Sequence, residues 1–156
     1  GTITISGGKC VAVGTGTPEG GFDCDQNTFA VTGGTLIGIG GTHSSPTESA
    51  TTQPCVFTSN LTFTAGQEYI LKGDSKILTY KAVRAFTGAT LLLSSPSFKK
   101  GSSYTFGDTS ISCSSDTWVT GTGGGMGPGG NNPGGPGGTP PGGTPGGTPP
   151  GGTPGK

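Results

Sequence analysis

The sequence predicts an all-β protein: a short parallel β-helix of two coils, then antiparallel strands, then an extended tail rich in glycine and proline. Three observations support this prediction. A strand–turn–strand motif occurs twice, 26 positions apart. Short β-type runs then follow at intervals of about 8 to 12 residues, a spacing typical of antiparallel strands and hairpins. Finally, residues 121–156 hold 18 of the 35 glycines and 9 of the 13 prolines.

The repeated motif occupies residues 3–14 and returns at residues 29–40. Each copy is an alternating strand, a Ser/Thr-Gly-Gly turn and a second alternating strand. A strict period of strands and turns is typical of a solenoid, and at about 3.3 Å per residue one period suffices for one coil. Two similar β-hairpins in a sandwich are the alternative. The residues expected inside the two coils are Ile3, Ile5, Val11, Val13, Phe29, Val31, Ile37 and Ile39.

Residues 1–54 form the first predicted segment, which contains the coils and a long polar loop from residue 42. Loops of this length usually have a function or cover another element. The second segment, residues 55–120, carries the short apolar runs and is expected to be antiparallel β-structure without helices. The third segment is the tail, residues 121–156.

The tail repeats Gly-Gly-Thr-Pro, which excludes the Gly-X-Y triplet of collagen and predicts an extended or polyproline-type chain. Its Thr-Pro pairs are typical O-glycan acceptors. Asn60-Leu61-Thr62 is an N-glycosylation sequon, a motif short enough to arise by chance. The predicted glycosylation sites are Asn60, Thr139, Thr144, Thr148 and Thr153.

The composition excludes several classes of protein. A formal net charge of zero argues against a nucleic-acid binder, and no apolar run is long enough to span a membrane. No leader pattern precedes the repeat, so we expect a leader to be absent or removed. The even number of cysteines without metal-binding spacing predicts disulfides in an oxidising, extracellular space. Their pairing stays open, within or between subunits, among Cys10, Cys24, Cys55 and Cys113.

Asp23 and Asp25 are two positions apart, so on a strand both would point to the same face. With Glu19 nearby they offer the hard oxygen ligands that Ca²⁺ prefers. A polar outer face with turn-forming residues is the simpler explanation. The same two carboxylates could serve a glycosidase. The chain has only Tyr69, Tyr80, Tyr104 and Trp118 to offer as a substrate platform, and they are scattered, so no catalytic residue is predicted.

Several of these motifs resemble the bacterial carbohydrate-binding β-helix proteins, whose relatives include a clostridial surface protein that binds plant polysaccharide. The similar stretches lie within about residues 1–106. Taken together their motifs are fairly specific for the family, whereas each motif alone is weak. Family members carry several more coils upstream than this chain. The resemblance implies a right-handed parallel β-helix, a surface location, calcium on acidic coil residues, and binding to acidic or cellulosic glycans. The stretches are residues 2–8, 21–25, 32–41, 45–47 and 52–53, with a tail-like run at 123–130.

Three functions from different classes follow from these observations. The first is a non-enzymatic, extracellular or surface-located structural subunit that assembles head-to-tail with copies of itself into a fibre and carries glycans. It rests on the exposed edge that a first coil presents to another chain. The second is a polysaccharide-binding module that depends on calcium. The third, a carbohydrate-active enzyme, is the least supported because no catalytic constellation is present.

Overall fold

A computed structural model describes residues 1–123, and it is all-β as predicted, with no α-helix in that range. The predicted glycosylation sites in the tail lie outside these residues. One 3₁₀ turn, Glu48–Ala50, interrupts the loop between the second and third strands. The strands are β1 (Ile3–Val13), β2 (Phe29–Gly40), β3 (Cys55–Phe63), β4 (Glu68–Lys72), β5 (Lys76–Lys81), β6 (Phe86–Ser94), β7 (Ser103–Phe106), β8 (Thr109–Ser112) and β9 (Val119–Thr120).

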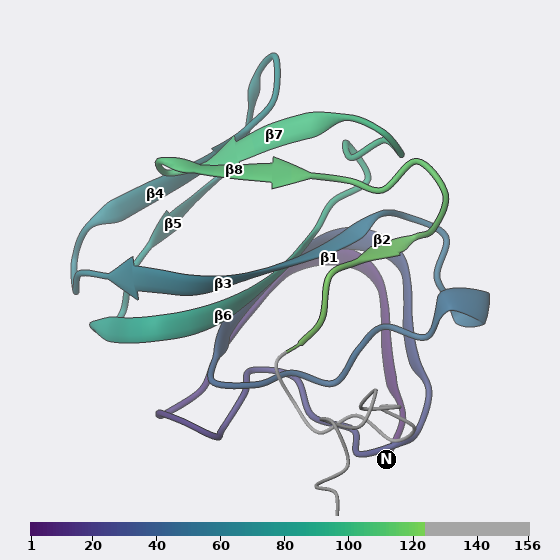
Figure 1. The fold of residues 1–156 in the computed structure, drawn as a ribbon, viewed down its shortest axis with the longest axis horizontal. Helices are drawn as coiled ribbons and strands as arrows, with labels where there is room; N and C mark the ends of the chain where they lie inside the picture. The colour runs from purple at the N-terminus through teal and green to yellow at the C-terminus, as the bar shows by residue number, and fades with distance from the viewer. Residues whose placement is uncertain (124–156) are drawn as a thin grey trace, which may run out of the picture.

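These strands form two sheets that face each other (Figure 1). The five-stranded sheet has the order β1-β2-β6-β3-β9, and the four-stranded sheet has the order β5-β4-β7-β8. In the five-stranded sheet, β6 runs opposite to β1, β2, β3 and β9. The predicted antiparallel strands after Cys55 are therefore present. Two of them, β3 and β6, join the same sheet as the repeat.

The two copies of the repeat lie side by side as the parallel strands β1 and β2. Ile3 pairs with Phe29 and Val11 with Ile37, so the register equals the repeat period on both sides of the Gly-Gly turn. Each copy is one bent strand rather than a hairpin, because the turn is a bulge with register shifts. A parallel β-helix is not shown, since the other neighbour of β2 is the antiparallel β6.

The expected inward-facing residues divide between two faces of the sheet. Phe29 and Val31 pack on one face, whereas Ile37 and Ile39 pack on the other. The bulge causes this switch, because one extra residue in a strand reverses the side on which the following side chains lie. All four are buried. Their counterparts in β1 are only partly buried, and Val11 is exposed, so the prediction of an interior Val11 is wrong.

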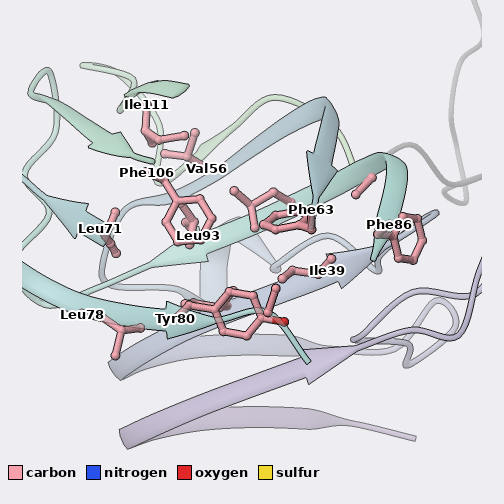
Figure 2. Packing of buried hydrophobic residues seen from close by; sticks show 14 of the residues in the cluster. Ile39, Val56, Phe63, Leu71, Leu78, Tyr80, Phe86, Leu93, Phe106 and Ile111 are labelled. Carbon is pink, nitrogen blue, oxygen red and sulfur yellow. The ribbon is translucent and has the colours of Figure 1, made fainter. Parts of the chain in front are cut away.

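The main hydrophobic core fills the space between the two sheets (Figure 2). Phe63 and Leu93 from the five-stranded sheet meet Phe106 of β7 there, and the Phe63 and Phe106 ring centroids are 6.2 Å apart. Leu91, Leu92 and Leu93 in the central strand β6 are fully buried. Alternate residues of a strand point to opposite faces, so Leu92 faces away from this core.

A second core covers the other face of the five-stranded sheet and contains Phe22, Phe29, Leu36 and Leu92. The loop at 42–54 lies alongside the first half of β2, and its residue His43 packs against Phe22 and Phe57 of this core. The Thr47 and Thr52 backbone N–H groups donate to the carbonyls of Phe29 and Val31, at 2.7 and 3.0 Å. The loop covers another element, one of the two roles expected for a loop of this length.

Candidate functional site: the free edge of the five-stranded sheet

The strand β1 is the terminal strand of the five-stranded sheet. Within residues 1–123 it has a strand neighbour only on the side of β2, so the backbone groups on its other side pair with no strand. An exposed edge of eleven residues is a template for pairing with another chain. Natural proteins usually shorten, charge or cover such an edge. Here the sole charged residue in the strand is Lys9.

Burial differs sharply between equivalent positions of the two repeat copies. Val11 is 47% exposed, whereas its partner Ile37 is 0% exposed. Ile37 has strands on both sides, β1 and β6, whereas Val11 has only β2. A further strand beside β1 would therefore give Val11 a second neighbouring strand, and would help to bury it as β1 helps to bury Ile37.

The glycines of the two turns show the same difference. A Cβ atom at Gly33 would lie 2.4 Å from the carbonyl oxygen of Ser6, and one at Gly34 would lie 2.6 Å from the backbone of Gly7. Gly33 and Gly34 are thus required because the backbone of β1 sits against them. At Gly7 a Cβ atom meets nothing within 4 Å, and φ is not positive. Nothing in residues 1–123 explains why position 7 is glycine, and a backbone approaching β1 from outside would explain it.

The edges of the four-stranded sheet differ from β1. The edge strand β5 begins with Lys76 and ends with Lys81, and charged side chains discourage pairing between edges. At the other edge, β8 has only four residues. Of the sheet edges in the described residues, β1 is the long one without flanking charges.

A polar cleft is the second candidate site. It has a volume of about 710 Å³ and lies between the β4–β5 turn, the loop after β6 and the start of β7. Tyr104 stacks on Phe98 with ring centroids 4.4 Å apart and donates its hydroxyl to the Ser97 carbonyl at 3.0 Å. Serine hydroxyls, one carboxylate and two ammonium groups line the same cleft. The charged lining residues are Asp74, Lys76 and Lys99.

The acidic residues proposed for calcium do not lie on a strand. Asp25 has a φ of 54° in a turn, and its N–H donates to the Asp23 carboxylate at 2.9 Å. The same-face argument, which assumed a strand, is therefore wrong, and the turn-forming explanation holds for Asp23. Glu19 contributes its backbone carbonyl to Gly41. Residues 1–123 contain no group of three or more His, Cys, Asp or Glu side chains that could hold a metal ion.

The four cysteines are all free thiols, so the structure does not show the disulfides that their even number predicts. The Cys24 thiol donates instead to the carbonyl of Asn27 at 3.5 Å, and that of Cys55 to the carbonyl of Gln53 at 3.5 Å. Burial raises the pKa of Cys113 to about 11. Burial also raises the pKa of Cys55 to about 11, with a smaller contribution from the nearby Cys113, and a hydrogen bond with Ser94 opposes this increase. These values keep both thiols protonated at neutral pH.

We expect one fast-reacting thiol in the native protein and four after unfolding. Cys10 is partly exposed on the free edge, whereas the other three cysteines are buried. Because the thiolate is the reactive species, burial and raised pKa values slow the reaction of Cys55 and Cys113 further. Titration with a chromogenic disulfide, before and after addition of denaturant, measures both numbers. Fewer than four thiols in unfolded, unreduced protein would restore the disulfide hypothesis.

Asn60 lies on the surface at a bulge in β3, with a φ of 63°. Its sequon partner Thr62 is also exposed, so the side chain is accessible to modification, and N-glycosylation stays a prediction. Asparagine tolerates the left-handed region better than most residues. That conformational role is a sufficient reason for Asn60 without a glycan.

His43 is more than the loop residue that the sequence suggests, because it is buried between Phe22 and Phe57, with ring centroids 6.4 Å from each. Its Nδ1 accepts the N–H groups of Gly21 and Phe22, at 3.2 and 3.4 Å. With Nδ1 an acceptor, the assigned tautomer carries its proton on Nε2, which donates to the Thr90 carbonyl at 2.9 Å. Burial lowers the pKa of His43, and the bond to Thr90 opposes this only in part.

This geometry predicts that the protein loses stability as the pH falls below about 6.5. The unfolded chain then binds a proton at His43 that the folded protein, with its lowered pKa, resists binding. The free energy of unfolding should fall by up to about 1.4 kcal/mol per pH unit from this group. Urea unfolding at pH 7.5 and 5.5 measures the loss. His43→Gln keeps one donor and one acceptor without the titration, and an equal pH dependence in that variant would contradict the assignment.

The sequence analysis missed three features: the buried hydrogen bonds of His43, the cleft around Tyr104, and the role of Glu48. The Glu48 carboxylate accepts the N–H groups of Trp118 and Val119, at 2.7 and 3.1 Å. The partners of His43 lie 21, 22 and 47 positions away, those of Glu48 lie 70 and 71 positions away, and the cleft lining is drawn from residues between Thr35 and Tyr104, so no local pattern marks these sites. Residues 1–123 contain no helix that is long and apolar enough to cross a membrane. No protein-family model, curated protein or solved structure significantly matches the chain.

Proposed function

We propose that this protein is a non-enzymatic structural subunit of an extracellular or cell-surface fibre, in which a neighbouring copy adds a strand to the free edge of β1. The comparison of equivalent repeat positions supports this proposal most directly. β2 needs Gly33 because a strand lies against it, and Gly7 repeats that feature where no strand of residues 1–123 lies. In the fibre, β1 and β2 are two stacked coils of right-handed, parallel β-helical type, and the five-stranded sheet continues from β1 into the sheet of the neighbour.

Strand addition supplies what the isolated edge lacks. Each added main-chain hydrogen bond satisfies a donor or acceptor that is otherwise hydrated, and a net contribution of about 0.5–1.5 kcal/mol per bond is typical. Burial of the exposed part of Val11 adds a hydrophobic contribution. A contact that uses different surfaces on the two copies generates an open filament when the rotation between the copies does not close a ring.

We expect purified protein to form filaments that electron microscopy detects, and Val11→Lys to abolish them. The substitution places an ammonium group where the added strand would bury a side chain, and lysine on an edge opposes pairing. Gly7→Val should act in the same way, by filling the space that a neighbouring backbone needs. Both variants should melt close to the wild-type monomer, because nearly half of the Val11 side chain is exposed and a Cβ atom at Gly7 meets nothing within 4 Å.

Val83→Lys is the matched control for the Val11 variant. Val83 is 73% exposed and lies outside every strand, so the same chemical change there should leave filament formation intact. A wild-type protein that stays monomeric at high concentration under native conditions would contradict the proposal. Filaments that persist in both Val11→Lys and Gly7→Val would show that the β1 edge is not the contact.

Glycan binding at the polar cleft is the second candidate function, favoured by the ring of Tyr104 surrounded by hydroxyl and charged groups. Carbohydrate sites combine an aromatic face with placed polar groups. Lys76 and Lys99 outnumber Asp74, so the cleft fits an acidic polysaccharide. Calcium dependence belongs to this alternative as a proposal. Its candidate ligands, Asp23, Asp25 and Glu19, lie outside the cleft and are not grouped for metal binding in residues 1–123.

Affinity electrophoresis in a gel containing polygalacturonate tests the alternative. Retardation should disappear in the Lys76→Ala, Lys99→Ala double variant. It should survive in Lys100→Ala, because Lys100 does not line the cleft and lies over the Trp118 ring, 3.9 Å from its centroid. Retardation that a chelator removes would support the calcium proposal. Equal retardation in all variants would exclude the cleft as the site.

A further inference from the structure

A strand that pairs with β1 must come from a free edge of the second copy. At the far side of the five-stranded sheet, β9 covers β3 only at Cys55 and Val56. Beyond Phe57, which lies against Gly121, residues 58–63 of β3 have no strand on that side within residues 1–123. Its exposed residues carry no charge, so they do not repel Lys9 of β1. The β5 edge, by contrast, carries Lys76 and Lys81.

The direction of the strands favours this partner. β1 and β3 run in the same direction, because β1 is parallel to β2 while β2 and β3 are both antiparallel to β6. The short strand β9 already pairs with β3 in parallel, so this edge of β3 accepts a parallel strand. A simple translation of one copy along the sheet therefore brings its β1 beside β3 of the next copy, with both sheet faces matched.

Both edges also bend at one residue in the left-handed region. In β1 this residue is Gly8, with a φ of 74°, and in β3 it is Asn60, with a φ of 63°. Inside the molecule, the bend of β1 lies against the corresponding bend of β2 at Gly34, with a φ of 81°. When two such bends stack, the strand segments before and after them stay in register. Asn60 can therefore lie against Gly8 on the open side of β1, as Gly34 lies against it on the β2 side.

We infer that the second copy seats residues 58–63 of its β3 on residues 6–11 of β1, in parallel and with Asn60 beside Gly8. In this register the two-residue strand β9 gives up its place beside Cys55 and Val56 to Ile3 and Thr4 of β1. This inference rests on the proposed fibre and names the surfaces that form its contact. The register places Thr62 of one copy beside Cys10 of the next, because Cys10 and Thr62 both follow their bend residues by two positions. A glycan on Asn60 would fill the contact, so assembly and glycosylation at this residue exclude each other.

A disulfide between copies tests the register. In Thr62→Cys filaments treated with molecular oxygen and a copper catalyst, the thiols of Cys10 and the new cysteine should lose two protons and two electrons to oxygen and form an S–S bond. A ladder of covalent oligomers should appear on a non-reducing gel, with a peptide joining positions 10 and 62. The ladder should vanish in Cys10→Ser, Thr62→Cys.

Ser110→Cys is the matched control, because Ser110 is an exposed residue of β8, a short edge strand of the four-stranded sheet. This variant should give no ladder. Filaments whose only cross-link joins Cys10 to Cys10 would overturn the inference in favour of a two-fold β1–β1 contact. The fibre would stand but would grow through a second contact, because a two-fold contact alone closes a dimer. Filaments with no cross-link at position 62 would also overturn it. An absence of filaments in the wild type is a different result, because it contradicts the proposed fibre itself.

Discussion

A Leu92→Ala variant is expected to lose about 2–5 kcal/mol of unfolding free energy, a large part of the 5–15 kcal/mol typical of a domain. Leu92 lies in the central strand β6, pairs with Gly38 on one side and Phe57 on the other, and is fully buried in the second core. Strands on both sides keep the backbone from collapsing into the space left by the lost atoms. Urea unfolding followed by circular dichroism measures the difference.

Two controls separate the cavity from other effects. Leu92→Met keeps most of the volume and should cost less than about 1.5 kcal/mol. Val83→Ala removes apolar atoms from an exposed side chain and should change the free energy by less than about 0.5 kcal/mol. If Leu92→Ala were no less stable than Val83→Ala, the second core would not contribute to folding as the structure indicates.

The second large effect is expected from Gly33→Ala, with Gly7→Ala as its matched partner from the other repeat copy. The new Cβ atom at position 33 would lie 2.4 Å from the Ser6 carbonyl oxygen, so β1 must shift away from β2. Overpacking of this kind typically costs about 1–3 kcal/mol. At position 7 the same atom meets nothing within 4 Å, and the dilute monomer should unfold at the wild-type denaturant concentration.

Comparing the pair at low and high protein concentration separates folding from assembly. Gly33→Ala should be less stable at every concentration, because its defect lies within the chain. Gly7→Ala should differ from the wild type only where the wild type assembles. Equal losses for both variants in the dilute monomer would show that the space beside Gly7 is not open.

Local patterns predicted the strands well, because period-2 alternation and turn residues act within a few positions. The repeat even predicted a long-range feature, the pairing of Val11 with Ile37, since equal sequences stack in equal positions. The repeat could not show that β6 returns antiparallel beside β2. That choice depends on the Leu91–Leu93 run, far along the chain, which is buried on both faces once it lies between β2 and β3.

The candidate site was partly predictable for the same reason. An exposed first coil followed from the repeat, but the exposure of Val11 depends on the bulge at Gly7 and Gly8, which turns the later residues to the other face. The prediction for Asp23 and Asp25 assumed that both lie on a strand, whereas the positive φ of Asp25 places this residue in a turn. The histidine at position 43 gave no local signal, since all its partners come from other parts of the chain.

The one-sided pairing of β1 has a consequence for the dynamics of the protein. A central strand such as β6 leaves its sheet only by breaking two ladders of hydrogen bonds, whereas β1 needs to break one. Local opening at the edge therefore requires less free energy than global unfolding, and the amide hydrogens of β1 exchange with solvent through that opening. The strand that opens most easily in the free subunit is the strand that receives a second ladder in the fibre. Growth would thus slow hydrogen exchange most at β1 and leave the centre of the sheet unchanged.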